Sequence, residues 1–518
     1  MADRAAVAAP TPAVPLTRRA SLNVVAFAVD FSAKTAVGLV ITPLLVDRLG
    51  TALYGTWEML ERLAGYVAGG AGRPADALRL LVANRHTVTD GATQRRTLGA
   101  ALVVWLIFLP LAATSGAVLA WFAPHITGAA SELYSTIRLG AALLFAAVTC
   151  GSLFAVPEAV LHGMNLGYRR MELQAAVNLV GGFLTAGAIW AGLGLAGVAG
   201  AELALAAVSG LCFWWLARTY VTWFGAARPT AGEARSLVGL SAWLSGGDVI
   251  AKLLLASDVL ILGALISPAA VATYVLTAYA PRAAVAIHGS AVGAAMPGLG
   301  GLIGERQYAR AALVRRELMA LTWLFATAVG ATILMWNRSF VTLWVGGEHF
   351  GGPWVDFLIV LIAAQTVFIR ADAYIIDAAL RSWLRVVFST VAVVVTITLA
   401  ALLTRALGIA GLCLGLLAGR LTQTVAYPLL AGRCVGSTCG ATPAVLARAA
   451  VVTGLLFVGA DYLGHRLITS SWLVWGTGVT ATLPFVAALA FAAGLSRTSR
   501  DAVKRRVAEV LRYPRAAR

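Results

Sequence analysis

Charged residues are scarce in this chain of 518 residues, because Asp, Glu, Lys and Arg together make up only 12% of it. A soluble protein carries roughly 25% charged residues, and half that supply cannot cover a surface exposed to water. Hydrophobic residues reach 60% and form long apolar runs from residue 21 to residue 495. The composition therefore excludes a soluble enzyme and a disordered scaffold, and it predicts an all-α polytopic membrane protein.

Acidic residues are scarcer than basic ones, with 23 Asp and Glu against 40 Lys and Arg, which gives a formal net charge of +17. Such a balance can indicate binding to nucleic acid, but the chain has no RNA- or DNA-binding motif. The basic residues lie at the ends of the apolar runs, as the positive-inside rule requires of a membrane protein. We therefore expect no nucleic-acid partner.

Motifs for catalysis and metal binding are missing. The sequence has no G-x-x-x-x-G-K-[ST], no H-E-x-x-H and no G-x-S-x-G. Its six histidines are scattered, and only Cys434 and Cys439 share a loop, which we place in the cytoplasm, where disulfides are rare. We expect no catalytic residue, no metal site, no bound cofactor and no enzyme activity.

The apolar runs predict fourteen membrane spans, since a helix needs about 20 residues to cross the hydrocarbon. Dividing the runs at charged residues and at Gly or Pro places the spans near 21–46, 52–83, 97–122, 134–160, 172–192, 194–217, 236–266, 268–299, 313–336, 353–379, 384–404, 407–431, 444–463 and 471–495. The connections are all short, and the longest outer one, about 337–352, is too small for a catalytic domain.

The distribution of basic residues predicts the orientation of these spans. With a cytoplasmic N-terminus, 27 Lys and Arg residues fall on the cytoplasmic side and five fall on the outer side: Arg48, Arg138, Arg338, Arg405 and Arg466. This asymmetry follows the positive-inside rule and requires an even number of spans. We expect a multi-pass protein of the bacterial inner membrane with both termini in the cytoplasm.

A weak internal repeat suggests how the spans are grouped. Asp30-Phe-Ser-Ala-Lys34 in the first span matches Asp248-Val-Ile-Ala-Lys252 in the seventh. A repeat six spans later has parallel topology, although two short matches can also arise by chance. The predicted organisation is a cytoplasmic N-tail (1–20), a six-helix bundle (21–218), a second six-helix bundle (236–432), two extra transmembrane helices (444–495) and a basic cytoplasmic tail (496–518).

Charges deep inside spans are costly and usually face a cavity or a partner. The candidate basic residues of a cavity are Lys34, Arg62, Lys252, Arg282 and Arg370. The candidate acidic residues are Asp30, Glu58, Glu61, Asp248 and Asp372. Arg282 has no acidic residue near it in sequence. Because arginine matches phosphate bidentately and lysine adds a point charge, the basic residues predict an anionic substrate. The acids either couple transport to H+ or Na+, or only hold the cations in place.

Several short motifs, in order and spacing, resemble those of the polysaccharide (O-antigen type) flippases of the MATE/MOP superfamily. The first hairpin reads Leu49-Gly50-Thr-Ala-Leu-Tyr54-Gly55-Thr-Trp57, similar to the LG-x-x-x-YG-x-W turn of that family. Later segments resemble the second-lobe counterpart and the outer loop after span 9: Asp258–Gly263, Pro268–Tyr274 and Leu343–Gly347. The stretch Ala71–Asp76 departs from the family, which often has an apolar or acidic D-x-G-type sequence there.

The resemblance implies two six-helix bundles around a central cationic cavity and transport by alternating access. The implied substrate is an undecaprenyl-pyrophosphate-linked oligosaccharide, moved from the cytoplasmic to the outer leaflet for polysaccharide biosynthesis. The cavity cations map best to Arg62, Lys252 and Arg282, with Lys34 close behind. Membrane lipid and, by resemblance, a polysaccharide polymerase and glycosyltransferases of the same pathway are the implied partners. Coupling to H+, to Na+ or to the membrane potential stays open.

Four other functions compete with this interpretation. A lipid II flippase is the same class of protein with a different sugar. A MATE-type cation-coupled drug exporter would prefer acidic and aromatic residues to Arg282. A membrane glycosyltransferase or polymerase needs a large outer loop with acidic residues, and a non-transporting scaffold needs no charges in mid-span.

Overall fold

The computed structural model describes residues 16–85, 90–164, 166–380, 382–436, 443–501 and 503–505. Every regular element in this part of the chain is a helix, which confirms the predicted all-α fold class. The helices are α1 (Leu16–Gly70), α2 (Pro74–Arg85), α3 (Gly91–Ile126), η1 (Ser131–Leu133), α4 (Tyr134–Gly163), α5 (Gly167–Trp190), α6 (Gly194–Tyr220), α7 (Ala231–Leu265), α8 (Pro268–Thr277), α9 (Tyr279–Gly304), α10 (Tyr308–Val345), η2 (Gly347–His349), α11 (Pro353–Ala378), α12 (Ser382–Gly419), α13 (Leu421–Cys434), α14 (Pro443–Arg466) and α15 (Trp472–Gly494).

Twelve helical stretches in the described residues are long and apolar enough to cross a membrane. Two of them, Val29–Gly70 with 42 residues and Trp383–Cys434 with 52, are too long for one crossing at about 1.5 Å per residue through roughly 30 Å of hydrocarbon. Each contains a glycine in the left-handed region, Gly50 with φ +77° and Gly408 with φ +60°. Breaks at these two glycines turn twelve stretches into fourteen spans, in agreement with the sequence prediction.

Three spans predicted as single helices are broken in the structure, and one of them, 407–431, is divided at Arg420 between α12 and α13. The predicted span 52–83 stops at Gly70, and α2 begins at Pro74 after Gly72 and Arg73, which both have positive φ. The predicted span 268–299 is α8 followed by α9, with the junction at Ala278. The composition gave no signal for the break at Ala278, because the residues on both sides of it are apolar.

The chain forms two compact units. The first consists of the described residues up to Arg48, Leu63–Pro124 and Ser131–Gly246, and its core joins α2, α3, α4, α6 and the start of α7. The second consists of Leu49–Arg62, His125–Ala130 and the described residues from Gly247 onward. Its core joins the end of α7 with α8, α11 and α12. The predicted domain bounds stay a prediction.

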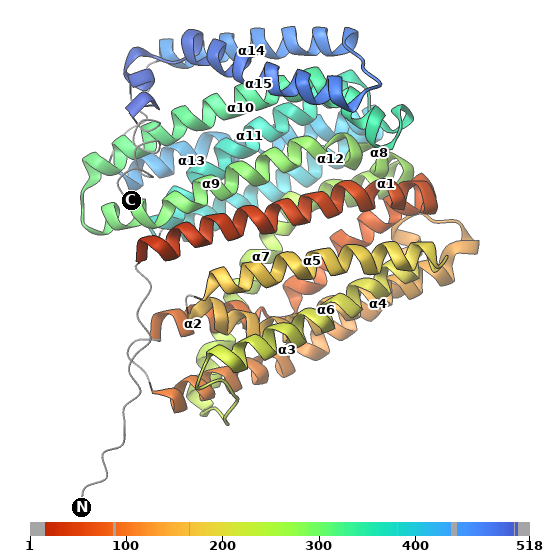
Figure 1. The fold of residues 1–518 in the computed structure, drawn as a ribbon, viewed down its shortest axis with the longest axis vertical. Coiled ribbons are helices and arrows are strands. Elements are labelled where there is room, and N and C mark those ends of the chain that lie inside the picture. The colour runs from red at the N-terminus through yellow and green to blue at the C-terminus, as the bar shows by residue number, and fades with distance from the viewer. Residues whose placement is uncertain are drawn as a thin grey trace, which may run out of the picture. The chain divides into compact units, whose positions relative to one another are not determined.

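The two C-terminal helices pack on α10 within the second unit, and Figure 1 shows α14 and α15 in blue beside α10 in green. Two indole nitrogens of α10 donate to threonine hydroxyls of these helices, Trp323 to Thr453 and Trp336 to Thr482, each at 3.1 Å. Backbones also come close, because a Cβ at Gly464 would meet the carbonyl oxygen of Leu334. Small residues and tryptophan hydrogen bonds therefore attach α14 and α15 to α10.

A short piece of α1 belongs to the core of the second unit. Met59 is fully buried against Val259 and Leu262 of α7 and Val271 of α8. One turn earlier, a Cβ at Gly55 would clash with the carbonyl oxygen of Pro268, the first residue of α8. The glycine of the Tyr54-Gly55 motif is therefore explained by close helix packing.

We expect Gly55→Ala to destabilise the chain by about 1–3 kcal/mol, because the added methyl group has no space beside the backbone of α8. Gly70→Ala is the matched control in the same helix, since a Cβ there meets nothing within 4 Å. Thermal unfolding of both purified variants tests this difference. Equal midpoints would show that the close packing of Gly55 on Pro268 is not important for stability.

Candidate functional site

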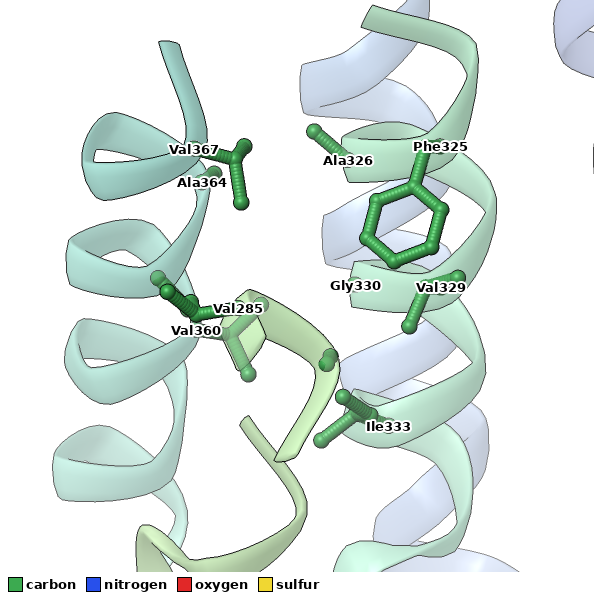
Figure 2. A pocket seen from close by; sticks show the side chains of 11 residues that line it. Val285, Phe325, Ala326, Val329, Gly330, Ile333, Val360, Ala364 and Val367 are labelled. Atoms are coloured by element: carbon green, nitrogen blue, oxygen red, sulfur yellow. The ribbon is translucent and has the colours of Figure 1, made fainter. Parts of the chain in front are cut away.

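An apolar cavity of about 20 Å³ lies between α9, α10 and α11 in the second unit (Figure 2). Val285 of α9, Phe325 and Val329 of α10, and Val360 of α11 point toward it. This volume would hold roughly one water molecule, and the apolar walls offer that molecule no hydrogen-bond partner. The cavity is a packing defect rather than a substrate site, so the candidate site must be built from the charged residues.

The first charged group joins three helices of the second unit around Asp258, whose side chain is only 8% exposed. Its Oδ2 accepts from the hydroxyl of Tyr274 on α8 at 2.9 Å and from the Nη2 of Arg282 on α9 at 3.2 Å. Its Oδ1 accepts from the backbone amide of Val259 at 2.8 Å. Arg282, which has no acidic neighbour in sequence, therefore does have an acidic partner, 24 residues earlier on α7.

A second charged group comes from the piece of α1 that packs in this unit. The hydroxyl of Tyr54 donates to Glu58 Oε1 at 2.9 Å, and Arg62 Nη2 lies 3.7 Å from Glu58 Oε2. Arg62 interacts electrostatically with Asp258, and Glu58 does so with Arg282, so the two groups share one environment. Glu61 is exposed on the same helix.

Two more arginines belong to this environment. Arg370 of α11 lies against α9, where a Cβ at Gly289 would be 3.3 Å from its Nη1. Arg420, at the junction of α12 and α13, is 5% exposed and interacts electrostatically with Asp258, Arg282 and Arg370. Its Nη1 donates to the hydroxyl of Thr366 at 2.9 Å. Arg420 was missed by sequence reasoning, although an arginine inside the predicted span 407–431 was itself a signal.

We call Arg62, Arg282, Arg370 and Arg420 the arginine cluster. Among the described residues, Glu58 and Asp258 accompany these four cations in ion pairs and charge interactions, and Glu61 adds a third negative charge on the same helix as Glu58. Among the described residues, Arg370 has neither a hydrogen bond nor an ion pair, and Arg420 has no carboxylate within ion-pair distance. The cluster therefore has a surplus of positive charge and donors available for an anion.

The two D-x-x-A-K copies differ in the structure. Lys252 Nζ lies 2.7 Å from Asp248 Oδ2, which makes a neutral pair on α7. In the first copy, Asp30 Oδ1 instead accepts from the Nδ2 of Asn178 on α5 at 2.9 Å, and Lys34 is exposed. Lys34 and Asp30 therefore lie in the first unit. Lys252 lies in the second unit, where it forms an ion pair with Asp248.

Asp372, two residues after Arg370 on α11, has a structural partner. Its Oδ1 accepts from Arg315 Nη2 on α10 at 2.9 Å, and the same nitrogen donates to the carbonyl oxygen of Pro428 at 3.0 Å. Both side chains are buried, so this pair links α10, α11 and α13. Among the described residues, no hydrogen bond or ion pair joins Asp372 to the arginine cluster.

Some predicted features fall outside the part of the chain that the structure describes. These are residues 1–15 of the N-tail, Cys439, and residues 506–518 of the basic tail. Within the described residues, no group of three or more His, Cys, Asp and Glu side chains could hold a metal ion.

Comparison with solved structures identifies the fold. The lipid II flippase MurJ, in an inward-closed conformation, is similar with a TM-score of 0.68 at 10% sequence identity, over 90% of this chain and 99% of that one. The chain has the fold of the MATE and MurJ transporters. An inward-facing multidrug resistance MATE family transporter of the MOP superfamily gives a TM-score of 0.61 at 14% identity, over 80% and 98% of the two chains.

A MATE protein in complex with MaD3S is also similar, with a TM-score of 0.58 at 15% identity over 81% of this chain and 96% of that chain. No protein-family model and no curated protein sequence matches the chain. The structural neighbours include both flippases and drug transporters, so the fold alone does not choose a substrate.

Proposed function

We propose that this chain is a flippase that moves a polyprenyl-pyrophosphate-linked oligosaccharide from the cytoplasmic to the outer leaflet by alternating access. The observation that carries the proposal is the arginine cluster, in which four cations lie with fewer acidic residues within one compact unit. A guanidinium group offers a planar pair of donors that matches phosphate oxygens. A diphosphate group is the part of such a lipid that this cluster fits.

The chemistry of the substrate explains why a protein of this kind is needed. A sugar hydroxyl without a hydrogen-bond partner costs several kcal/mol in hydrocarbon, whereas the polyprenyl tail can stay in the lipid. A diphosphate carries about two negative charges. With the cytoplasm negative, outward movement therefore gains roughly 4–5 kcal/mol per 100 mV. The membrane potential is one driving force for the proposed direction, and H+ or Na+ coupling is a second.

Two related functions, a lipid II flippase and a MATE-type exporter of organic cations, would need different charges around their substrates. A lipid II flippase would use the cluster in the same way, since its substrate also presents a diphosphate, and MurJ is a structural neighbour. A MATE-type exporter of organic cations would need a surplus of acidic residues around its substrate. The surplus of arginines favours the first class over the second.

The fate of the lipid-linked oligosaccharide in cells that lack this protein tests the proposal. We expect the intermediate to accumulate on the cytoplasmic leaflet, and we expect the wild-type chain to relieve the accumulation. Accumulation of lipid II instead would favour the second flippase function. Unchanged lipid-linked sugars together with reduced efflux of cationic dyes would contradict the flippase proposal and favour the exporter. The same cells can be used to test the proposed links to a polysaccharide polymerase and glycosyltransferases.

A further inference from the structure

A buried acid and a buried amide meet where α8, α10 and α11 come together in the second unit. Asp356, in the first turn of α11, and Asn337, on α10, are each 2% exposed. The Nδ2 of Asn337 donates to Asp356 Oδ1 at 2.7 Å and to the backbone carbonyl oxygen of Thr277, the last residue of α8, at 2.9 Å. The pair thus ties the end of α8 to both neighbouring helices, in a place that the proposed substrate site does not use.

The orientation of the Asn337 amide is fixed by its neighbours. Both groups that face Nδ2 are acceptors, so the nitrogen must point toward them and the oxygen must point elsewhere. The Oδ1 of Asn337 is buried and has no hydrogen-bond partner. A buried acceptor without a partner costs about 1–3 kcal/mol, which means that the site lacks one hydrogen-bond donor.

The site also lacks a cation. Among the described residues, no Lys, Arg or His lies within ion-pair distance of Asp356. The ionisable groups near this end of the elements packed around it are Tyr274 on α8, Arg338 on α10, Glu348 and His349 on η2, and Asp461, His465 and Arg466 on α14. Of these, Asp461 acts on Asp356 with a negative charge, and its own ion-pair partner is His465 at 3.3 Å. An ionised Asp356 would therefore be a buried carboxylate without compensation.

One ligand supplies both the missing donor and the missing charge. We propose that Asp356 and Asn337 form a proton-binding site, in which the protonated carboxyl of Asp356 donates to Asn337 Oδ1 while Asn337 Nδ2 donates to Asp356 Oδ1. A carboxylic acid and a primary amide complement each other in this way, with two parallel hydrogen bonds. No metal or organic ligand is needed, and none of the atoms involved belongs to the arginine cluster.

The position of the site connects it to the arginine cluster through the backbone. The side-chain amide of Asn337 donates to the carbonyl oxygen of Thr277, and the next residue is Ala278. The carbonyl oxygen of Ala278 accepts from the backbone amide of Arg282 at 2.9 Å. Loss of the proton would remove the proposed hydrogen bond to Asn337 Oδ1, beside the junction that places Tyr274 and Arg282.

Substitution by asparagine tests the proton site without any substrate. Asp356→Asn keeps the size of the side chain and supplies the second donor permanently, so it imitates the protonated acid at every pH. A proton bound at this site in the folded wild type would stabilise it most at acidic pH, whereas Asp356→Asn keeps both donors at every pH. We expect the thermal midpoint of Asp356→Asn, relative to that of the wild type, to rise steadily from acidic to alkaline pH.

Asp461→Asn is the matched control on α14, because it removes the nearby negative charge but not the proposed proton-binding carboxyl. Infrared spectra of the full-length wild type at acidic pH should contain the carbonyl band of a protonated carboxylic acid, which Asp356→Asn lacks and Asp461→Asn retains. A difference in midpoint that is constant with pH, or a carbonyl band unchanged by Asp356→Asn, would overturn the proposal. Because neither readout involves a transported lipid, failure of the flippase proposal would leave this result intact.

Discussion

Replacing Arg370 with glutamine is expected to reduce translocation of the lipid-linked substrate about tenfold to a hundredfold and to leave the folded chain as stable as the wild type. Arg370 has no hydrogen bond or ion pair among the described residues, so its loss leaves no carboxylate without a partner. Hydrogen bonds to a charged group contribute about 1.5–3 kcal/mol each, and each 1.4 kcal/mol corresponds to a factor of ten. A substrate diphosphate is the partner that the side chain lacks.

Translocation rate and thermal midpoint, measured on the same preparation, test this separation of function from stability. Arg310→Gln is the matched control, because it makes the same chemical change at an exposed position of α10, where the side chain donates a hydrogen bond to Gln307. If Arg370→Gln and Arg310→Gln transport equally well, Arg370 does not bind the substrate. If Arg370→Gln unfolds, its role is structural.

Arg282→Ala is expected to lose both stability and translocation, for a reason that differs from that for Arg370. Removing one partner of a buried ion pair costs about 3–5 kcal/mol, because the other charge is left buried without compensation. Since the Arg282 side chain is 35% exposed, we expect the lower end of this range. Asp258 would keep its hydrogen bonds from Tyr274 and from the Val259 amide but would lose its cation.

The double variant Arg282→Ala with Asp258→Asn separates the two losses. Neutralising Asp258 removes the uncompensated charge, so thermal stability should return toward the wild-type value while translocation stays low. Restored translocation in the double variant would show that Arg282 only neutralises Asp258 and does not contact the substrate. Low stability in the double variant would contradict the ion-pair explanation.

The architecture was predictable from sequence because it follows from hydropathy and length. A chain with 12% charged residues and apolar runs of about 20 residues has few alternatives to a helical membrane protein. The break at Gly50 falls between the predicted spans 21–46 and 52–83, and the break at Gly408 lies at the start of the predicted span 407–431, which is why the predicted number of spans is fourteen. The break at Ala278 was not predicted, because it depends on how α8 and α9 pack rather than on a local change in polarity.

The candidate site was predictable only in part. Arg62, Arg282 and Arg370 were identified from the cost of a charge in mid-span, and the structure brings them into one environment with Arg420. The pairing of Arg282 with Asp258 was hidden by a separation of 24 residues and by the helix break between them.

Identical local patterns also led to different partners. Asp248 pairs with Lys252 one turn later, whereas Asp30 accepts a hydrogen bond from Asn178, which is 148 residues away. The i,i+4 spacing places two charges on one helix face, but the neighbouring helix decides which partner is available. The roles proposed for these acids and for Lys34 therefore remain predictions.

Reconstitution of the purified chain in sealed vesicles tests the flippase proposal most directly. The vesicles carry a fluorescent polyprenyl-diphosphate-linked oligosaccharide, and a membrane-impermeant reagent reports how much of it has crossed to the other leaflet. We predict rapid crossing with the wild-type chain, slow crossing with Arg370→Gln, and no crossing in vesicles without protein. Equal crossing with and without the wild-type chain, while the same preparation transports an organic cation, would contradict the proposal.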